Sequence, residues 1–130
     1  MELSVTTEQG RVPVTVLHVK GNVDSTTYQA FQTEAEKLIA DGTQNLLVDL
    51  HDVPYMSSAG LRSLNQIYNK LRAKGEDQST ITKGVTAGTY KSPHLKLLSP
   101  SARVLDTLKM SGFDMFLDIR SNLQDAVASF

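Results

Sequence analysis

Residues 46–62 read LLVDLHDVPYMSSAGLR and join a short apolar segment to the start of an amphipathic one. The first five residues are almost all apolar, which is typical of a strand covered on both faces of a sheet. After Leu61, apolar residues recur every three or four positions, and this spacing predicts a helix that ends at Gly75. Ser57 and Ser58 lie between the two segments, so we expect a central parallel strand to give way to a helix at this serine pair.

The N-terminal residues predict an antiparallel hairpin. Leu3–Thr6 alternates apolar and polar residues, Val12–Val19 is rich in β-branched residues, and Gln9 and Gly10 supply the turn between them. Pro13 lacks a backbone N–H, so it should be the first residue of its strand or lie at the sheet edge.

Alternating helices and strands are predicted from residue 21 onward. The first helix has its apolar residues at Tyr28, Phe31, Ala35, Leu38 and Ile39, and Gly42 should end it. Residues 95–98 should form the next strand, followed by a helix that Ser99 caps with Pro100 at its first position and that ends at Gly112. Residues 113–119 should form a last strand, and Ser121 with Gln124 fits a capping box before a final helix.

The pattern indicates a single α/β domain spanning residues 1–130. We expect a mixed sheet of four to five strands with an N-terminal hairpin and about four helices packed mainly on one face. Residues 76–93 are rich in Gly, Ser, Thr and Lys and have no sustained period, so they should form a flexible insertion loop, with a short strand near residues 80–82.

Composition narrows the function classes. The chain of 130 residues has a net charge of -1 and no cysteine, no secretory signal at its N-terminus, and no apolar run of about 18 residues that could cross a bilayer. We therefore expect a cytoplasmic protein that inserts into no membrane and binds no nucleic acid directly. Its partners should be a protein or a small molecule, and it should exist as a monomer or weak homodimer.

Two interpretations of the serine pair follow from residue chemistry. Serine is a preferred N-cap residue, so Ser57 and Ser58 can simply cap the helix. A helix N-terminus also carries partial positive charge and free N–H groups, which can donate hydrogen bonds to a phosphate carried on a serine hydroxyl. Arg62 lies four residues after Ser58 on the same helical face, where it could pair with a phosphate or with an acidic group on a partner.

Three segments together resemble a STAS domain of the bacterial anti-sigma factor antagonist group. They are Gly21–Thr26, Tyr55–Arg62, and the region from Leu98 to Phe113. The similarity spans nearly the whole chain, and its most specific part is Ser-Ser-Ala-Gly-Leu-Arg after a strand.

This resemblance implies a non-enzymatic switch without cofactor or metal. Family members bind an anti-sigma factor that has serine kinase activity, thereby freeing a sigma factor for transcription, and phosphorylation turns them off. The phosphorylated residue should be Ser58, with Ser57 as the second candidate because it replaces the Asp found there in many members. Asp24 should contact the kinase or its metal-nucleotide region, although it could equally just cap the first helix. The implied partner-binding residues are Asp24, Thr26, Ser57, Ala59, Gly60 and Arg62.

Other functions have weaker support. The three histidines, at positions 18, 51 and 94, lack the spacing of a zinc site, and no Gly-x-Ser-x-Gly elbow indicates a hydrolase. Two alternatives keep the fold. One is an unphosphorylated STAS scaffold or accessory subunit of a signalling or transport complex, in which Ser58 only caps its helix. The other is a small-ligand module for nucleotide or lipid, which needs a concave apolar pocket.

Overall fold

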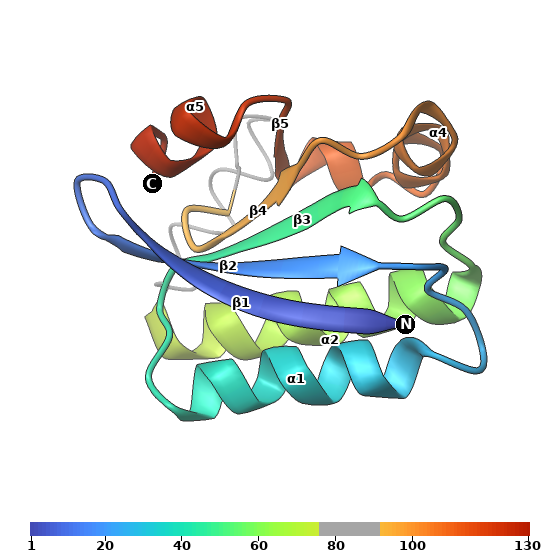
Figure 1. Cartoon of the computed structure of the whole chain (residues 1–130), viewed down its shortest axis with the longest axis horizontal. Coiled ribbons are helices and arrows are strands. Elements are labelled where there is room, and N and C mark those ends of the chain that lie inside the picture. The colour runs from blue at the N-terminus through green and yellow to red at the C-terminus, as the bar shows by residue number, and fades with distance from the viewer. Residues whose placement is uncertain (76–91) are drawn as a thin grey trace.

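The computed structural model describes residues 1–75 and 92–130. These residues contain one five-stranded mixed sheet. The strands lie in the order β1-β2-β3-β4-β5; β1 is antiparallel to β2, and the other neighbours are parallel (Figure 1). Their bounds are Glu2–Gln9, Pro13–Lys20, Leu46–Asp52, Leu95–Leu98 and Asp118–Arg120. The predicted hairpin, central parallel strand and mixed sheet are confirmed.

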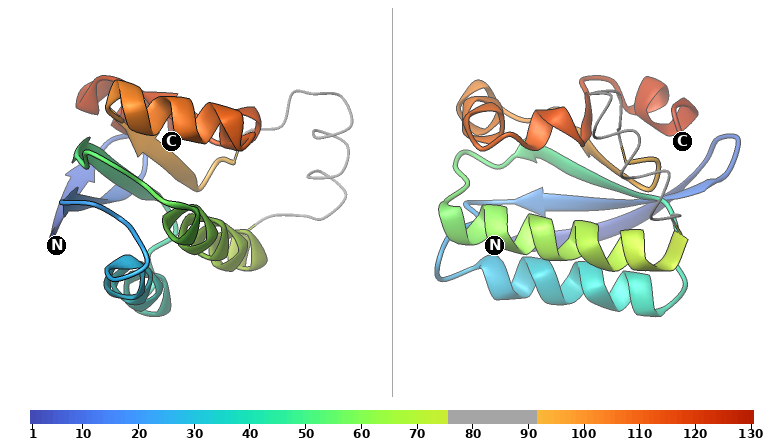
Figure 2. Two further views of the ribbon diagram at one scale, coloured as in Figure 1. Left: turned by 90° about the vertical axis from the view of Figure 1, so that its right-hand side faces the viewer. Right: turned by 180° about the vertical axis from the view of Figure 1, so that it is seen from behind.

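Four α-helices of the described residues pack on this sheet. Their bounds are Tyr28–Ala40 for α1, Ser58–Gly75 for α2, Ala102–Met110 for α4 and Leu123–Ala128 for α5. The helices α1 and α2 lie side by side against one face, while α5 lies on the opposite face (Figures 1 and 2). No helix among the described residues is both long and apolar enough to span a membrane.

Strand alternation divides the core into two clusters. On β2, Leu17 and Val19 face α1, α2 and α4, whereas Val14 and Val16 face α5. The first face carries the larger cluster, which also includes Phe31 of α1. Three of the four helices therefore share one core, which confirms that they pack mainly on one face.

Proline and glycine residues explain where several strands and helices begin or end. Pro13 is the first residue of β2, paired with Gln9, as its missing N–H requires. Gly42 follows α1 with φ of 111°, and Gly112 follows α4 with φ of 80°. Both glycines occupy the left-handed conformation that ends a helix at low steric cost.

Three sequence predictions about the C-terminal third are wrong. The N-cap of α4 is Ser101, whose hydroxyl accepts the Val104 N–H at 3.3 Å, rather than Ser99. Residues 113–115 form a 3₁₀ turn, η1, instead of a strand, and only the last part of the predicted segment enters the sheet. Asn122 caps α5 by accepting the Asp125 N–H, so Ser121 and Gln124 form no capping box there.

At the starts of α4 and α5, a neighbouring residue of similar capping preference takes the N-cap position. The predicted loop at 76–93 and its short strand lie outside the described residues, apart from Ser92 and Pro93.

A parallel bridge joins two turns that follow neighbouring strands. The N–H of Val23 donates to the carbonyl of Tyr55 at 3.0 Å, and the N–H of Ser57 donates to the carbonyl of Val23 at 2.9 Å. A Cβ on Gly60 would lie 2.8 Å from that same Val23 carbonyl and 2.8 Å from Cγ of Met56. Only glycine at position 60 lets the first turn of α2 approach this closely.

We predict that Gly60→Ala destabilises the protein, although Gly→Ala inside a helix normally stabilises it. The added methyl group meets backbone that cannot move away, so the loss should be about 1–3 kcal/mol, as for other overpacked sites. Urea unfolding of the variant measures it. Asn65→Ala, on the exposed side of the same helix, is the control and should change stability by less than about 0.5 kcal/mol. A Gly60→Ala protein as stable as the wild type would contradict the close-approach argument.

Candidate functional site

The residues singled out from the sequence meet at the carboxyl ends of β2 and β3. This is the edge of an open α/β sheet where ligands usually bind, because the turns into several helices converge there. The turn at Asp24 and the junction at Ser57 are tied together by the Val23–Met56 bridge. The start of α4 joins them, because the Ser101 hydroxyl donates to the carbonyl of Val53 at 3.3 Å.

The two serines have different environments. Ser57 is half-buried and precedes α2; its Oγ accepts the Gly60 N–H at 3.4 Å, and its carbonyl accepts the Leu61 N–H at 2.9 Å. Ser58 is the first residue of α2 and is exposed. Its hydroxyl makes no hydrogen bond to any residue that the structure describes. Ser57 thus occupies the capping position, and Ser58 presents a free hydroxyl beside the positive end of an 18-residue helix.

Asp24 organises the turn before α1. Its Oδ1 accepts the backbone N–H of Thr26 at 2.9 Å, the hydroxyl of Thr26 at 2.7 Å and the hydroxyl of Thr27 at 3.2 Å. These hydrogen bonds, led by that from the Thr26 hydroxyl, hold the pKa of the carboxyl below its ordinary value. Because Thr27, not Asp24, is the N-cap residue of α1, the carboxylate shapes the turn rather than capping the helix.

A groove of about 590 Å³ begins at Ser58. One wall is formed by residues of α2 at three- and four-residue spacing. The other wall is formed by the segment that comes directly after α4 in the chain. The lining residues are Ser58, Leu61, Arg62, Asn65, Gln66, Ser111, Phe113 and Phe116. Phe116 packs against Phe113 at 5.3 Å and against Tyr68 at 5.0 Å between ring centroids, so the apolar floor rests on a packed aromatic cluster.

The remaining predicted site residues fall into two groups. Arg62 and Thr26 are exposed, and Arg62 lines the same groove as Ser58. Ala59 is only 6% exposed and Gly60 is buried against Val23, so they contribute to the site chiefly by keeping the first turn of α2 close to the neighbouring turn.

Sequence reasoning missed most of the groove. Leu61 packs against the core, as its helical spacing predicts, and Phe113 is expected in a strand, yet both side chains also line this surface. The exposed polar residues Asn65 and Gln66 continue the stripe from Ser58 at helical spacing, and this was the signal that could have extended the site. Among the described residues, no group of three or more His, Cys, Asp or Glu side chains could hold a metal ion.

We predict that Thr26→Val raises the pKa of Asp24 toward 3.8, because it removes the strongest of the hydrogen bonds that favour the carboxylate. In the wild type, the stability contributed by this turn should be fully present above the unfolded pKa and should be lost as the pH falls through the lowered folded pKa. An NMR titration of the Asp24 carboxyl carbon measures the shift. Thr7→Val, on β1, is the control, and an unchanged Asp24 pKa in Thr26→Val would contradict this account.

Comparison with known proteins supports the fold and gives the family. Three solved structures that resemble the chain are an anti-sigma factor antagonist from Mycobacterium paratuberculosis (21% identity, 98% of this chain and 93% of that chain, TM-score 0.73), a STAS domain protein described as an anti-sigma-factor antagonist from Planctomyces limnophilus (19%, 96% and 93%, 0.68), and the phosphorylated form of the Bacillus cell fate determinant SpoIIAA (14%, 95% and 96%, 0.62). At these identities the likeness establishes the fold alone.

A search of curated protein sequences returned no match. The model of the STAS domain family matches residues 4–77, which is more than half of the chain and includes both the Asp24 turn and the serine junction. The chain therefore belongs to the STAS domain family.

Proposed function

We propose that this protein is a bacterial anti-sigma factor antagonist that binds an anti-sigma factor with serine kinase activity and is switched off by phosphorylation of Ser58. One observation carries the proposal. The Ser58 hydroxyl is exposed and unbonded within the described chain, at the N-terminus of α2, and Ser58 lines a groove with an apolar floor. In this role the protein acts in the cytoplasm as a binding switch of sigma-dependent transcription, without catalysis of its own.

Ser58 lies where the fold can accommodate the negative charge of a phosphate group. A phosphate adds about -1.5 to -2 charges and three acceptor oxygens. At the first position of α2 it would meet free backbone N–H groups and the positive end of the helix dipole, and no acidic residue lies in the first turn to repel it. The fold should therefore tolerate the modification.

The surroundings of Ser58 explain why such a charge would weaken docking. A partner that fills the groove must bury the apolar side chains of Leu61, Phe113 and Phe116. A phosphate at the rim of this surface would have to lose part of its hydration when the partner docks, and burying charge without a matched cation is costly. Asp24 already places one negative charge on the neighbouring turn, so a second one changes the potential of the whole face.

Ser57 is the less suitable acceptor. Its Oγ already accepts a helix N–H and is half-buried, so a kinase would have to open the cap to reach it. The exposed Arg62 side chain lies one helical turn after Ser58 and offers a cation for an acidic group of the partner; a phosphate on Ser58 would compete with the partner for this cation.

We predict that Ser58→Ala binds the cognate anti-sigma factor but takes up no phosphate, whereas Ser58→Asp loses binding while its thermal unfolding midpoint stays near that of the wild type. The purified protein is incubated with the anti-sigma kinases encoded in the same genome, ATP and Mg²⁺. Phosphate is mapped by mass spectrometry, and binding is measured by calorimetry.

The matched control is Ser57→Ala. It should lower stability by about 0.5–2 kcal/mol through loss of the cap and still be phosphorylated at position 58. Phosphate incorporation into Ser58→Ala equal to that of the wild type would refute the assigned position. Undiminished binding by Ser58→Asp would leave the fold assignment standing but would refute the switch.

A further inference from the structure

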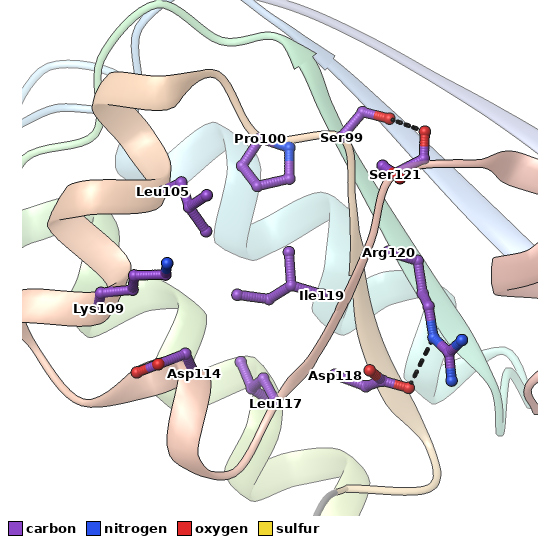
Figure 3. Close-up of a pocket in the computed structure, with 10 residues that line it drawn as sticks. All are labelled: Ser99, Pro100, Leu105, Lys109, Asp114, Leu117, Asp118, Ile119, Arg120 and Ser121. Atoms are coloured by element: carbon purple, nitrogen blue, oxygen red, sulfur yellow. Dashed lines mark hydrogen bonds and ion pairs between the residues drawn. The ribbon is translucent and has the colours of Figure 1, made fainter.

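A second concave site is separate from the Ser58 groove. It is a pocket of about 440 Å³ between α4 and β5, and it shares no lining residue with that groove. Figure 3 shows the side chains of Leu105, Leu117 and Ile119 converging on the same space, with Pro100 at one end. Its volume lies within the range of ligand sites, and its floor is apolar.

One wall of this pocket is an open sheet edge. β5 is the last strand in the sheet order, so within residues 1–75 and 92–130 only β4 pairs with it. The N–H of Ser99 donates to the carbonyl of Arg120 at 2.7 Å, and Arg120 is in register with Leu98. In a parallel ladder, successive residues turn their backbone groups alternately toward and away from the neighbour. Because Arg120 faces β4, the N–H and C=O of Ile119 point outward from the sheet, where no strand of the described residues pairs with them.

The end of this edge is held in a strained conformation. Ser99 has φ of 52°, the only positive φ of a non-glycine residue in the described chain. Its hydroxyl donates to the carbonyl of Ser121 at 3.0 Å, and its N–H donates to the carbonyl of Arg120. These two hydrogen bonds hold the C-terminal end of β5 against β4. Strained residues of this kind concentrate at binding sites, where they fix a geometry before the ligand arrives.

The opposite side of β5 carries an excess of positive charge. Asp118 and Arg120 point away from the pocket, and Arg120 Nε donates to Asp118 Oδ2 at 3.0 Å (Figure 3). The same carboxylate oxygen lies 3.4 Å from Nζ of the buried Lys96, so two cations share one anion. The Arg120 side chain is 41% exposed, and no hydrogen bond from its two terminal nitrogens to a described residue accompanies the one from Nε.

We propose that β5 binds an extended peptide segment of a partner protein as a sixth strand, with an aliphatic side chain of the segment in the pocket and an acidic residue on each side of it. Side chains alternate along a strand. The residue beside Ile119 therefore projects into the pocket, and its two neighbours project to the side of Arg120. Backbone hydrogen bonds to Ile119 supply affinity, while the pocket and the positive charge supply sequence selectivity. This site is independent of the Ser58 switch.

The test uses the full chain and the fluorescently labelled peptide acetyl-Thr-Glu-Leu-Glu-Thr-amide. Fluorescence anisotropy should show saturable binding, and amide shifts in an NMR titration should centre on Ile119 and Leu105. Three peptides probe the three contacts separately. They replace Leu by Ser, replace both Glu by Lys, or methylate the three central amide nitrogens. Each should bind about tenfold more weakly or worse, the loss typical of removing one anchor contact.

Two protein variants locate the site. Leu105→Gln should weaken binding of the parent peptide about tenfold by placing an amide in the pocket, and Arg120→Gln should abolish the preference for Glu over Lys. Ser58→Asp is the control and should bind the peptide as the wild type does. The proposal is overturned if the parent peptide does not bind, if the methylated peptide binds equally well, or if the shifts centre on the Ser58 groove.

Discussion

The short contact between the Val23 carbonyl and the first turn of α2 fixes the geometry of the candidate docking face. Val23 accepts the Ser57 N–H, and only a glycine at position 60 allows the helix to come this close. The contact sets where α2 begins, and therefore which serine caps the helix and which is presented to solvent. It also places the Asp24 turn next to Ser58, although 33 intervening residues and the whole of α1 separate them in the chain. Backbone atoms, rather than side chains, hold these parts together.

The order of the strands and helices could be predicted from the sequence, because each element carries its own periodicity and its own stop. Pro13, Gly42 and Gly112 fill the positions that their backbone chemistry requires, and the helix after the serine pair follows from its apolar spacing. The two errors in helix capping lie where several neighbouring residues have similar capping preference. Ser99 and Ser101 both satisfy the N-cap preference, and only the path of the chain after β4 decides between them.

The position of the candidate site in the fold could be predicted from the sequence, but only some of the residues that form its surface could. The resemblance named the Asp24 turn and the serine pair, and the structure brings them together at one edge of the sheet. The sequence alone does not decide which of the two serines caps α2. Ser57 caps the helix and Ser58 does not, because α2 begins at Ser58, and a shift of its start by one residue would exchange their roles. The groove walls from Phe113 and Phe116 were also missed, since they come from a segment whose apolar pattern resembles a strand.

The pairing of the two turns through main-chain hydrogen bonds has an evolutionary consequence. Main-chain bonds do not depend on which side chains surround them, so exposed positions such as Ser58 and Arg62 can be exchanged with little effect on the scaffold. After gene duplication, two copies of such a domain can diverge in recognition while keeping the same architecture. Several signalling pathways that use this one fold can thereby operate in the same cell without binding each other's partners.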